Sequence, residues 1–296
     1  MKLSELLKDV EYELLQGSPD TEVNMVQNDS RKVTPGALFF CVTGAVFDGH
    51  KYAAEVAEKG AAVIVVEKDI DLRGNETVAV VKVKSTRYAM GVICSAFYGE
   101  PSKKLTVVGI TGTKGKTTTT YMIKSMLEAA GHKTGLIGTI ESIVGDKVTP
   151  ASNTTPESIV MQKTLHEMVE AGLDSVVMEV SSQGLMLDRV AGIDFDYGIF
   201  TNLSEDHIGP NEHKDFAEYL GWKAKLFTLC KTGIFNVDDT YCEDILKGHT
   251  CDVITYGEKD GSDYQAEDLH LYKKDGELGI TYHLKGKYEE QVQVSL

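Results

Sequence analysis

Long apolar segments are missing from this 296-residue sequence, in which no run approaches the roughly 18 consecutive apolar residues of a membrane-spanning helix. Residues 1–15 interrupt their apolar positions with charged ones at helical spacing, which is unlike a signal peptide. The sequence therefore argues against membrane insertion, and we expect a cytoplasmic protein.

Cysteine is also scarce, and its five residues form neither a Cys-x-x-Cys pair nor another close zinc-ligand spacing. This usage fits a reducing compartment, where disulfides are rare. Because free cysteine usually behaves as a small core residue, we expect structural thiols at all five positions. They are Cys41, Cys94, Cys230, Cys242 and Cys251.

Basic residues are outnumbered, with 30 Lys and Arg against 45 Asp and Glu, so the formal net charge is −15. Nucleic acids and anionic membranes are polyanions that attract clustered Lys and Arg. This charge balance argues against both as partners, and any bound phosphate has to be held by a local site. We expect a monomer.

Length and composition indicate a folded chain of two domains. Hydrophobic residues make up 42% of the chain and the mean hydropathy is −0.16, as in ordinary globular proteins. At roughly 100 to 200 residues per domain, the length corresponds to about two domains. Turn formers and charges gather at residues 98–104 (YGEPSKK), so we place the boundary between domains of residues 1–100 and 101–296.

Both domains are predicted to be α/β. In the first, helical spacing near the N-terminus precedes strands at 38–42, 61–66 and 78–83 and helices at 50–59 and 86–98. In the second, the expected strands are 105–110, 175–180, 197–201 and 233–237, and the expected helices are 117–130, 156–171 and 215–229. Such alternation predicts a mostly parallel sheet covered by helices. From residue 263 two further strands are expected, with Asp275 and Gly276 near their turn.

The most specific local signal is a strand, a glycine-rich turn and a helix at residues 107–118 (VVGITGTKGKTT). Glycine lets backbone N–H groups approach an anion, and a helix N-terminus adds favourable partial charge. The match is GxxGKT, because Ile110 stands where a strict P-loop has glycine. The alternative is a glycine-rich connection with a solvated lysine.

We favour a P-loop ATPase domain, with Lys116 reaching the terminal phosphates of ATP and the Thr117 hydroxyl meeting Mg²⁺. The predicted ATP-binding residues are Gly112, Thr113, Lys114, Gly115, Lys116, Thr117 and Thr118.

Further segments resemble the Mur ligases, in the order in which that family carries them. They are residues 111–117 (TGTKGKT), 153–157 (NTTPE), 178–182 (MEVSS) with Arg189, 201–207 (TNLSEDH) and 223–227 (KAKLF). Residues 29–32 (DSRK) and 35–39 (PGALF) look like the UDP-binding N-terminal domain of the members that add the third residue of the peptidoglycan stem peptide. The resemblance covers nearly the whole chain.

This resemblance implies ATP-dependent amide-bond formation on UDP-MurNAc-L-Ala-D-Glu, with ATP and an amino acid as the other partners. The γ-phosphoryl group passes to the substrate's terminal carboxylate, and the amine then attacks the acyl phosphate. A carboxylate is a poor electrophile at neutral pH, so activation is needed. Phosphoryl transfer depends on positioning and charge neutralisation.

The resemblance also implies two Mg²⁺ ions. Glu179 lies at the C-terminal end of a predicted strand, where ligands collect in α/β sheets, and would bind one ion with Thr117. His207 would bind the second ion, although magnesium prefers oxygen ligands. The alternatives without a metal role are an exposed carboxylate at a strand end for Glu179 and an ordinary loop histidine for His207.

Lys223 is implied to react with CO₂, and its carbamate would give Mg²⁺ an oxygen ligand. That reaction needs a neutral amine, and we expect partial burial beside Trp222 and Phe227 to lower the pKa of Lys223. The alternative is a helix-surface lysine like Lys225. Lys116, His207 and Lys223 are thus the predicted catalytic residues.

Substrate contacts are implied in both domains. In the first, Ser30 and Arg31 would contact the UDP portion, while for Asp48 and His50 a UDP contact and a polar turn remain open. In the second, arginine suits carboxylate or phosphate because its planar fork binds them bidentately. The positions that match those holding the muramoyl sugar and peptide are Thr154, Thr155, Ser181 and Arg189.

The sequence departs from the family at three places. Gln183 stands where a histidine is usual, which leaves neutral hydrogen bonding there. Residues 208–213 (IGPNEH) replace the usual Tyr-His-Gly stretch. The family's C-terminal amino-acid-binding domain and an asparagine-rich helix are not found, so we expect an incomplete ATP-binding domain that does not complete the reaction alone.

Two rival functions remain. A folylpolyglutamate synthase shares the ATP site and the lysine but has no need of a UDP-recognising domain. A truncated, noncatalytic relative would hold the UDP-linked precursor without ligating it.

Overall fold

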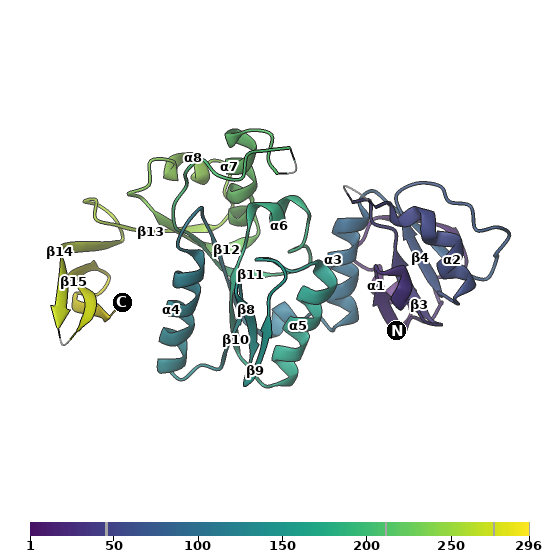
Figure 1. The fold of residues 1–296 in the computed structure, drawn as a ribbon, viewed down its shortest axis with the longest axis horizontal. Helices are drawn as coiled ribbons and strands as arrows, with labels where there is room; N and C mark the ends of the chain where they lie inside the picture. The colour runs from purple at the N-terminus through teal and green to yellow at the C-terminus, as the bar shows by residue number, and fades with distance from the viewer. Residues whose placement is uncertain (45–46, 211, 275, 296) are drawn as a thin grey trace.

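The computed structural model describes residues 1–44, 47–210, 212–274 and 276–295, which fold around two sheets (Figure 1). The sheets lie on either side of the predicted boundary, and α3 and α5 meet between them. Three residues of the sequence analysis, the turn residue Asp275, Asn211 and the terminal Leu296, lie outside the described residues.

The first sheet has five strands in the order β1-β5-β4-β3-β2, parallel except for β1 against β5. Its strands are β1 Tyr12–Gln16, β2 Met25–Gln27, β3 Ala37–Phe40, β4 Val63–Val66 and β5 Ala79–Val83. Its helices are α1 Leu3–Leu6, α2 Ala53–Glu58 and α3 Thr86–Phe97, with 3₁₀ turns η1 Ser30–Lys32 and η2 Gly49–Tyr52. Alternate strand residues face opposite sides: α1 and α3 cover one face, and α2 covers the other.

The second sheet has eleven strands in the order β16-β15-β14-β13-β12-β11-β6-β10-β7-β8-β9. Neighbours from β14 to β7 run parallel, and antiparallel strands extend both ends. Its strands are β6 Thr106–Thr111, β7 Thr134–Ile137, β8 Glu141–Val144, β9 Lys147–Pro150, β10 Ser175–Glu179, β11 Phe195–Phe200, β12 Cys230–Asn236, β13 Asp252–Gly257, β14 Tyr264–Lys274, β15 Glu277–Gly286 and β16 Glu290–Ser295. Its helices are α4 Lys116–Ala129, α5 Ser158–Glu170, α6 Ser182–Met186, α7 Phe216–Ala224 and α8 Cys242–Leu246, with 3₁₀ turns η3 Pro101–Lys104 and η4 Lys225–Thr228.

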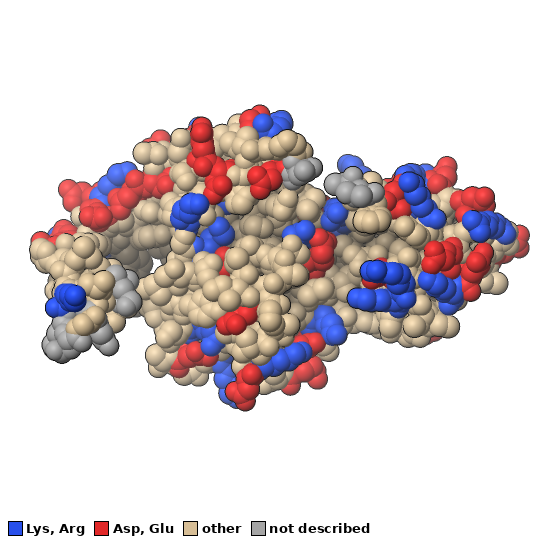
Figure 2. All heavy atoms as spheres, viewed as in Figure 1, with Lys and Arg blue, Asp and Glu red and all other residues tan. Residues whose placement is uncertain are grey.

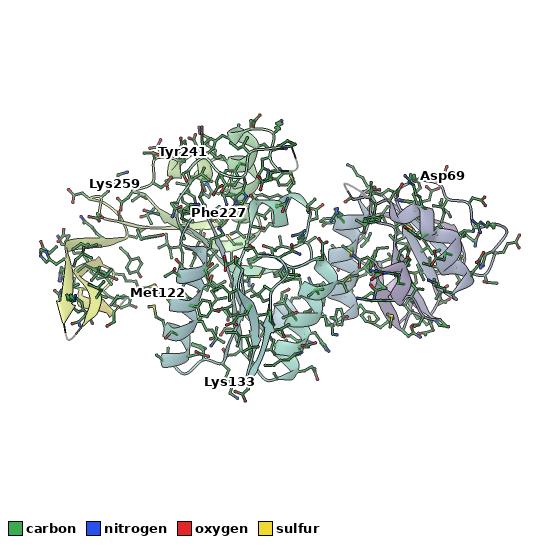
Figure 3. The ribbon with its side chains drawn as sticks, in the orientation of Figure 1. Asp69, Met122, Lys133, Phe227, Tyr241 and Lys259 are labelled. Carbon is green, nitrogen blue, oxygen red and sulfur yellow. The ribbon has the colours of Figure 1, made fainter. Side chains whose placement is uncertain are left out.

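The core of this sheet follows the two-residue period of its strands. Val107 packs toward α5 and α7, whereas Val108 and Ile110 pack toward Ile123 and Leu127 of α4. Phe227, fully buried, lies inside the central body, and Met122 lies on α4 (Figure 3). Helices therefore cover both faces of the parallel strands, which confirms the predicted α/β fold.

The sequence misplaced several elements. The predicted helix 215–229 is α7 followed by the 3₁₀ turn η4, and the two strands expected after residue 263 are three. Strands β1, β2, β7, β8, β9 and β13 and the short helices α6 and α8 were not predicted. Strand β7 is buried but only four residues long, and the other five strands are short or partly to fully exposed and lack a continuous apolar run. All five cysteines are buried, as expected. Among the described residues, no helix has the length and apolar character to cross a membrane.

The two sheets are joined by a close backbone contact between α3 and the segment that follows α6. A Cβ built at Gly91 of α3 would lie 2.5 Å from the Ala191 carbonyl oxygen, and one at Gly192 would lie 2.8 Å from the Gly91 carbonyl oxygen. Gln162 of α5 donates from the other side to the carbonyls of Ala191 and Gly192, at 3.4 and 3.3 Å. Residues 189–192 are thus enclosed between two helices.

Replacing Gly91 with alanine should lower the free energy of unfolding by about 1–3 kcal/mol, because the new methyl group meets backbone rather than a flexible side chain. Gly221→Ala is the matched control, since Gly221 is also helical and a Cβ there meets nothing within 4 Å. That variant should be stabilised by up to about 1 kcal/mol. Urea titrations of the two variants measure the difference, and equal stabilities would contradict the tight junction.

Candidate functional site

The site residues predicted for the second domain gather at the C-terminal edge of β6, β10 and β11, around a cavity of about 750 Å³. Open parallel sheets collect ligands at this edge because the loops after adjacent strands meet there. The cavity is lined by residues 113–118, 139, 151–154, 179, 181–183, 189, 207, 212–213 and 223. On the face drawn in Figure 2, acidic and basic residues are interspersed without one broad basic patch, in keeping with the net charge.

The predicted phosphate loop, residues 112–116, leaves β6 in a conformation that requires glycine. Gly112 has φ +150°, and a Cβ there would lie 2.0 Å from the Thr201 hydroxyl oxygen. The next residue is fixed by a 2.8 Å bond from the Thr113 N–H to the Asn202 carbonyl. Gly115, with φ +81°, is the N-cap of α4. The free N–H groups of a 14-residue helix therefore open toward the cavity.

Lys116 lies at the start of α4 and is turned back onto the loop. Its ammonium donates to the carbonyls of Gly112 and Thr113, at 2.9 and 3.1 Å. Burial lowers its pKa, while the Glu179 carboxylate acts in the opposite direction. The side chain is therefore placed to exchange backbone carbonyls for a polyanionic phosphate, a far stronger partner for a partly desolvated ammonium.

Glu179 is buried and acts as an acceptor at the end of β10. Its Oε1 accepts from the Thr117 hydroxyl at 2.9 Å and from the Thr139 N–H at 2.8 Å. The Thr139 hydroxyl lies 3.0 Å from Oε2 and from the Thr154 hydroxyl. A carboxylate and a hydroxyl beside a phosphate loop fit Mg²⁺, which proteins usually bind through one or two carboxylates plus phosphate and water oxygens.

Lys223 is 1% exposed, which excludes the helix-surface alternative. Its ammonium donates to the Gly112 carbonyl at 2.8 Å and lies 4.5 Å from the centre of the Tyr219 ring. Burial, and secondly the charge of Lys116, hold the pKa of Lys223 well below its usual value. The aromatic neighbour differs from the expected Trp222, whose ring lies under Lys225 instead.

His207 and His213 enter the cavity from the loop after β11. His207 has φ +56°, and its Nδ1 lies 2.9 Å from Glu212 Oε1. The sequence analysis missed His213, which is 1% exposed with its Nε2 2.9 Å from the Ser182 hydroxyl. In the sequence, His213 was marked only by its place in residues 208–213, the segment that differs from the usual motif of the resembled family. Among the described residues, no three His, Cys, Asp or Glu side chains converge as a metal site.

Of the residues predicted to contact substrate in the second domain, Thr154, Ser181 and Arg189 line the cavity, whereas Thr155 is fully buried beneath it. The Thr155 hydroxyl lies 3.0 Å from the Glu179 carbonyl and 3.1 Å from the Ser181 hydroxyl. Arg189 donates to the Thr155 carbonyl at 3.1 Å. Thr155 therefore links the C-terminal end of β10 to the N-cap of α6, and its hydrogen bonds hold Ser181 and Arg189 in place.

The candidate UDP-contacting residues of the first domain lie outside the cavity lining. Ser30 and Arg31 form η1, where Arg31 is exposed and lowers the pKa of Asp29 to about 2 through a bidentate bond. His50 is buried, with Nδ1 2.7 Å from Asp48 and Nε2 accepting from the Glu67 N–H at 3.0 Å. Both His50 nitrogens are engaged within the fold, which favours the polar-turn interpretation of Asp48 and His50.

Comparison with known proteins agrees with this geometry. A family model described as Mur ligase middle domain matches residues 110–296, and one described as Mur ligase family, catalytic domain, matches residues 22–98. A UDP-N-acetylmuramoyl-L-alanyl-D-glutamate–2,6-diaminopimelate ligase 1 from Clostridium acetobutylicum is 46% identical, covering 97% of this chain and 61% of that protein. A similarly named ligase from Clostridium tetani is 43% identical over the same shares. The chain spans about three fifths of the length of these relatives.

Solved structures share the fold. A UDP-N-acetylmuramoyl-L-alanyl-D-glutamate–2,6-diaminopimelate ligase superposes with a TM-score of 0.81 at 24% identity, covering 99% of this chain and 59% of that one. A Mycobacterium tuberculosis folylpolyglutamate synthase complexed with ADP and AMPPCP has a TM-score of 0.53 at 16% identity and covers 70% of this chain and 53% of that one.

Replacing Lys223 with methionine should raise the free energy of unfolding by about 1 kcal/mol or more at pH 7, because the change removes a buried amine that forms no ion pair with the described residues and feels only the more distant charge of Asp206. Lys225→Met, two residues further on in the 3₁₀ turn η4 and half-exposed, should change the free energy of unfolding by less than about 0.5 kcal/mol. Both are measured by urea titration in CO₂-free buffer.

The increase in the free energy of unfolding that Lys223→Met causes should also depend on pH. Between the lowered folded-state pKa and 10.5, the unfolded chain binds more protons at Lys223, so this group makes the wild type more stable as the pH rises. The gain should therefore be largest below the folded-state pKa and fade toward pH 10.5. A gain that does not vary with pH would contradict a neutral Lys223.

Proposed function

The chain belongs to the Mur ligase family, and we propose that it forms the UDP-precursor-binding and ATP-binding parts of an ATP-dependent ligase that adds the third amino acid to UDP-MurNAc-L-Ala-D-Glu. The observation that carries this proposal is the shared cavity, in which the phosphate loop and Glu179 face Ser181 and Arg189. A donor of phosphate and an acceptor carboxylate would meet between these groups. The named relatives are ligases of that dipeptide precursor with 2,6-diaminopimelate.

The first step is phosphoryl transfer to the precursor's terminal carboxylate. The helix α4 N-terminus and Lys116 would hold the β- and γ-phosphates, and Thr117 with Glu179 would hold Mg²⁺, which neutralises charge on the transferring group. Arg189 would fix the substrate carboxylate as nucleophile. The oxygen–phosphorus bond of the acyl phosphate forms as the β,γ-bridging bond of ATP breaks and ADP leaves.

The second step is attack by the amino group of the third residue. The carbonyl carbon forms a bond to nitrogen, inorganic phosphate leaves with the bond that held it, and the amine loses a proton. Phosphate is a good leaving group, so the cavity has mainly to hold the reactants in line and to exclude water.

Lys223 is proposed to bear a carbamate. A neutral amine forms a nitrogen–carbon bond to CO₂ and releases one proton, so that a neutral amine becomes an anionic oxygen ligand. The burial of Lys223 and its lowered pKa supply the neutral amine, and its position beside Gly112 and Lys116 would place the new carboxylate at the phosphate loop.

Selective thermal stabilisation tests the substrate class. UDP-MurNAc-L-Ala-D-Glu at a hundredfold excess over Kd should raise the Tm by roughly 5 °C, because it binds only the folded chain. Mg-ADP should do so as well, whereas UDP-GlcNAc should act weakly and a folate not at all. Stabilisation by a folate, or by Mg-ADP alone, would reject the muramoyl assignment.

Two reciprocal variants sharpen this test. Arg189→Met should lose the response to the muramoyl dipeptide and keep that to Mg-ADP, and Lys116→Met should do the reverse. Each variant is the other's control for folding.

The carbamate is tested by exposing the chain to carbon-13-labelled CO₂ at neutral pH and recording carbon-13 NMR spectra. A single protein-bound carbamate resonance is expected in the wild type and in Lys225→Ala, and it should vanish in Lys223→Ala. A resonance that persists in Lys223→Ala, or none in the wild type, would refute the assignment.

A further inference from the structure

The guanidinium of Arg189 is held by a group at the junction of the two sheets. Its Nη2 lies 2.7 Å from Oε1 of Glu157, the residue that precedes α5. The other carboxylate oxygen of Glu157 lies 3.5 Å from Nη1 of Arg87, in the first turn of α3. One carboxylate thus joins an arginine from the N-terminal part of the chain to the arginine that lines the cavity.

Glu157 is free for this task because its side chain makes no capping bond to α5. The backbone around Arg189 is fixed independently: Ser158 lies within 3.4 Å of the carbonyls of Asp188 and Arg189, and the Arg189 N–H donates to Gly184. Because the backbone is fixed, the conformational freedom of Arg189 lies mainly in its long side chain. Glu157 and the Thr155 carbonyl restrict that side chain.

The charge of this cluster is unbalanced. Two carboxylates, Glu157 and Asp188, face three cations, Arg87, Arg189 and Lys225. Glu157 pairs with both guanidinium groups, whereas Asp188 lies 3.8 Å from the Lys225 ammonium. Burial raises the pKa of Asp188, and the charges of Lys225 and Arg87 act in the opposite direction. Both arginine side chains are largely buried, with Arg189 11% and Arg87 21% exposed. Among the described residues, Arg189 Nε and Arg87 Nη1 are buried without a hydrogen-bond acceptor. A buried N–H without an acceptor is costly, so the cluster retains capacity for an anion.

We propose that Arg87 and Glu157 are positioning residues that set the orientation and the charge of Arg189 for an anionic group of the substrate. Glu157 orients the guanidinium, and Arg87 competes for Glu157, so that Arg189 is not neutralised by its own partner. The proposal rests on the proposed function in one respect, namely that Arg189 binds the precursor.

The arrangement has a consequence for how the two parts of the chain cooperate. Arg87 belongs to α3, whose Gly91 contacts the segment after Arg189. A shift of α3 relative to α5 would therefore alter both the backbone position and the ionic partner of Arg189. The position of α3 and the orientation of the Arg189 guanidinium are therefore linked through Glu157.

The test is a double-mutant cycle on the 296-residue chain, with dissociation constants measured by calorimetry for UDP-MurNAc-L-Ala-D-Glu and for Mg-ADP. Arg87→Met keeps the apolar stem but leaves Glu157 to neutralise Arg189, and should weaken dipeptide binding about fivefold. Glu157→Gln keeps the shape but loses the ionic link, with a similar loss. Mg-ADP binding should change less than twofold in every variant.

The decisive outcome is the coupling. If Arg87 acts through Glu157, adding Arg87→Met to Glu157→Gln should cause no further loss of dipeptide affinity. Additive losses, or single variants that bind the dipeptide like the wild type, would overturn the proposal. Arg87→Lys, which restores a cation, should recover part of the affinity, whereas a merely structural role would not depend on charge.

Two controls separate the possible failures. Glu170→Gln, an exposed carboxylate at the other end of α5, should match the wild type for both ligands. A wild-type chain that binds Mg-ADP but not the dipeptide would reject the proposed function itself. A parallel loss of Mg-ADP affinity in Arg87→Met would indicate general distortion and would reject the positioning role.

Discussion

The carbonyl oxygen of Gly112 is the point on which the site depends. It accepts from the ammonium groups of both Lys116 and Lys223, at 2.9 and 2.8 Å. Two buried amines on one oxygen repel each other when both are charged, and this repulsion adds to burial in lowering the pKa of Lys223. The oxygen is available because Gly112 adopts a φ of +150° against Thr201, where a side chain has no room. Backbone geometry thus brings the Lys223 amine, with its lowered pKa, to the glycine-rich loop.

A second constraint concerns the segment that runs from the end of β10 through α6 to Arg189. Glu179 is held at the end of β10 by Thr117 and Thr139, and the chain then turns through Ser181, the N-cap of α6. Arg189 follows that short helix and is enclosed between α3 and α5. One continuous stretch of chain, residues 179–189, therefore carries both the carboxylate proposed to bind metal and the arginine proposed to bind the precursor. Precise positioning matters because phosphoryl transfer requires the reacting atoms in line.

The sequence was sufficient where local chemistry is strict. Glycine spacing around Lys116 predicted the phosphate loop, and buried β-branched runs predicted β3, β4, β6 and β10 with the helices between them. It failed for β7, which is buried but only four residues long, and for β8, β9 and β13, which are half-exposed or exposed and whose residues carry no clear period. Expected roles for Ser30 and Arg31 stay predictions, because the cavity lining does not include them.

By itself, then, the sequence indicated the family through the resemblance of several motifs, and it indicated the parallel α/β architecture and the glycine-rich loop through spacing along the chain. Only the tertiary structure decided that Lys223 is buried over Tyr219 rather than beside Trp222, that Thr155 supports the site from beneath, and that His213 enters it. It alone joined Arg87 to Glu157 and Arg189. These facts arise from contacts between segments far apart in the chain, where burial and charge depend on neighbours that no local pattern records.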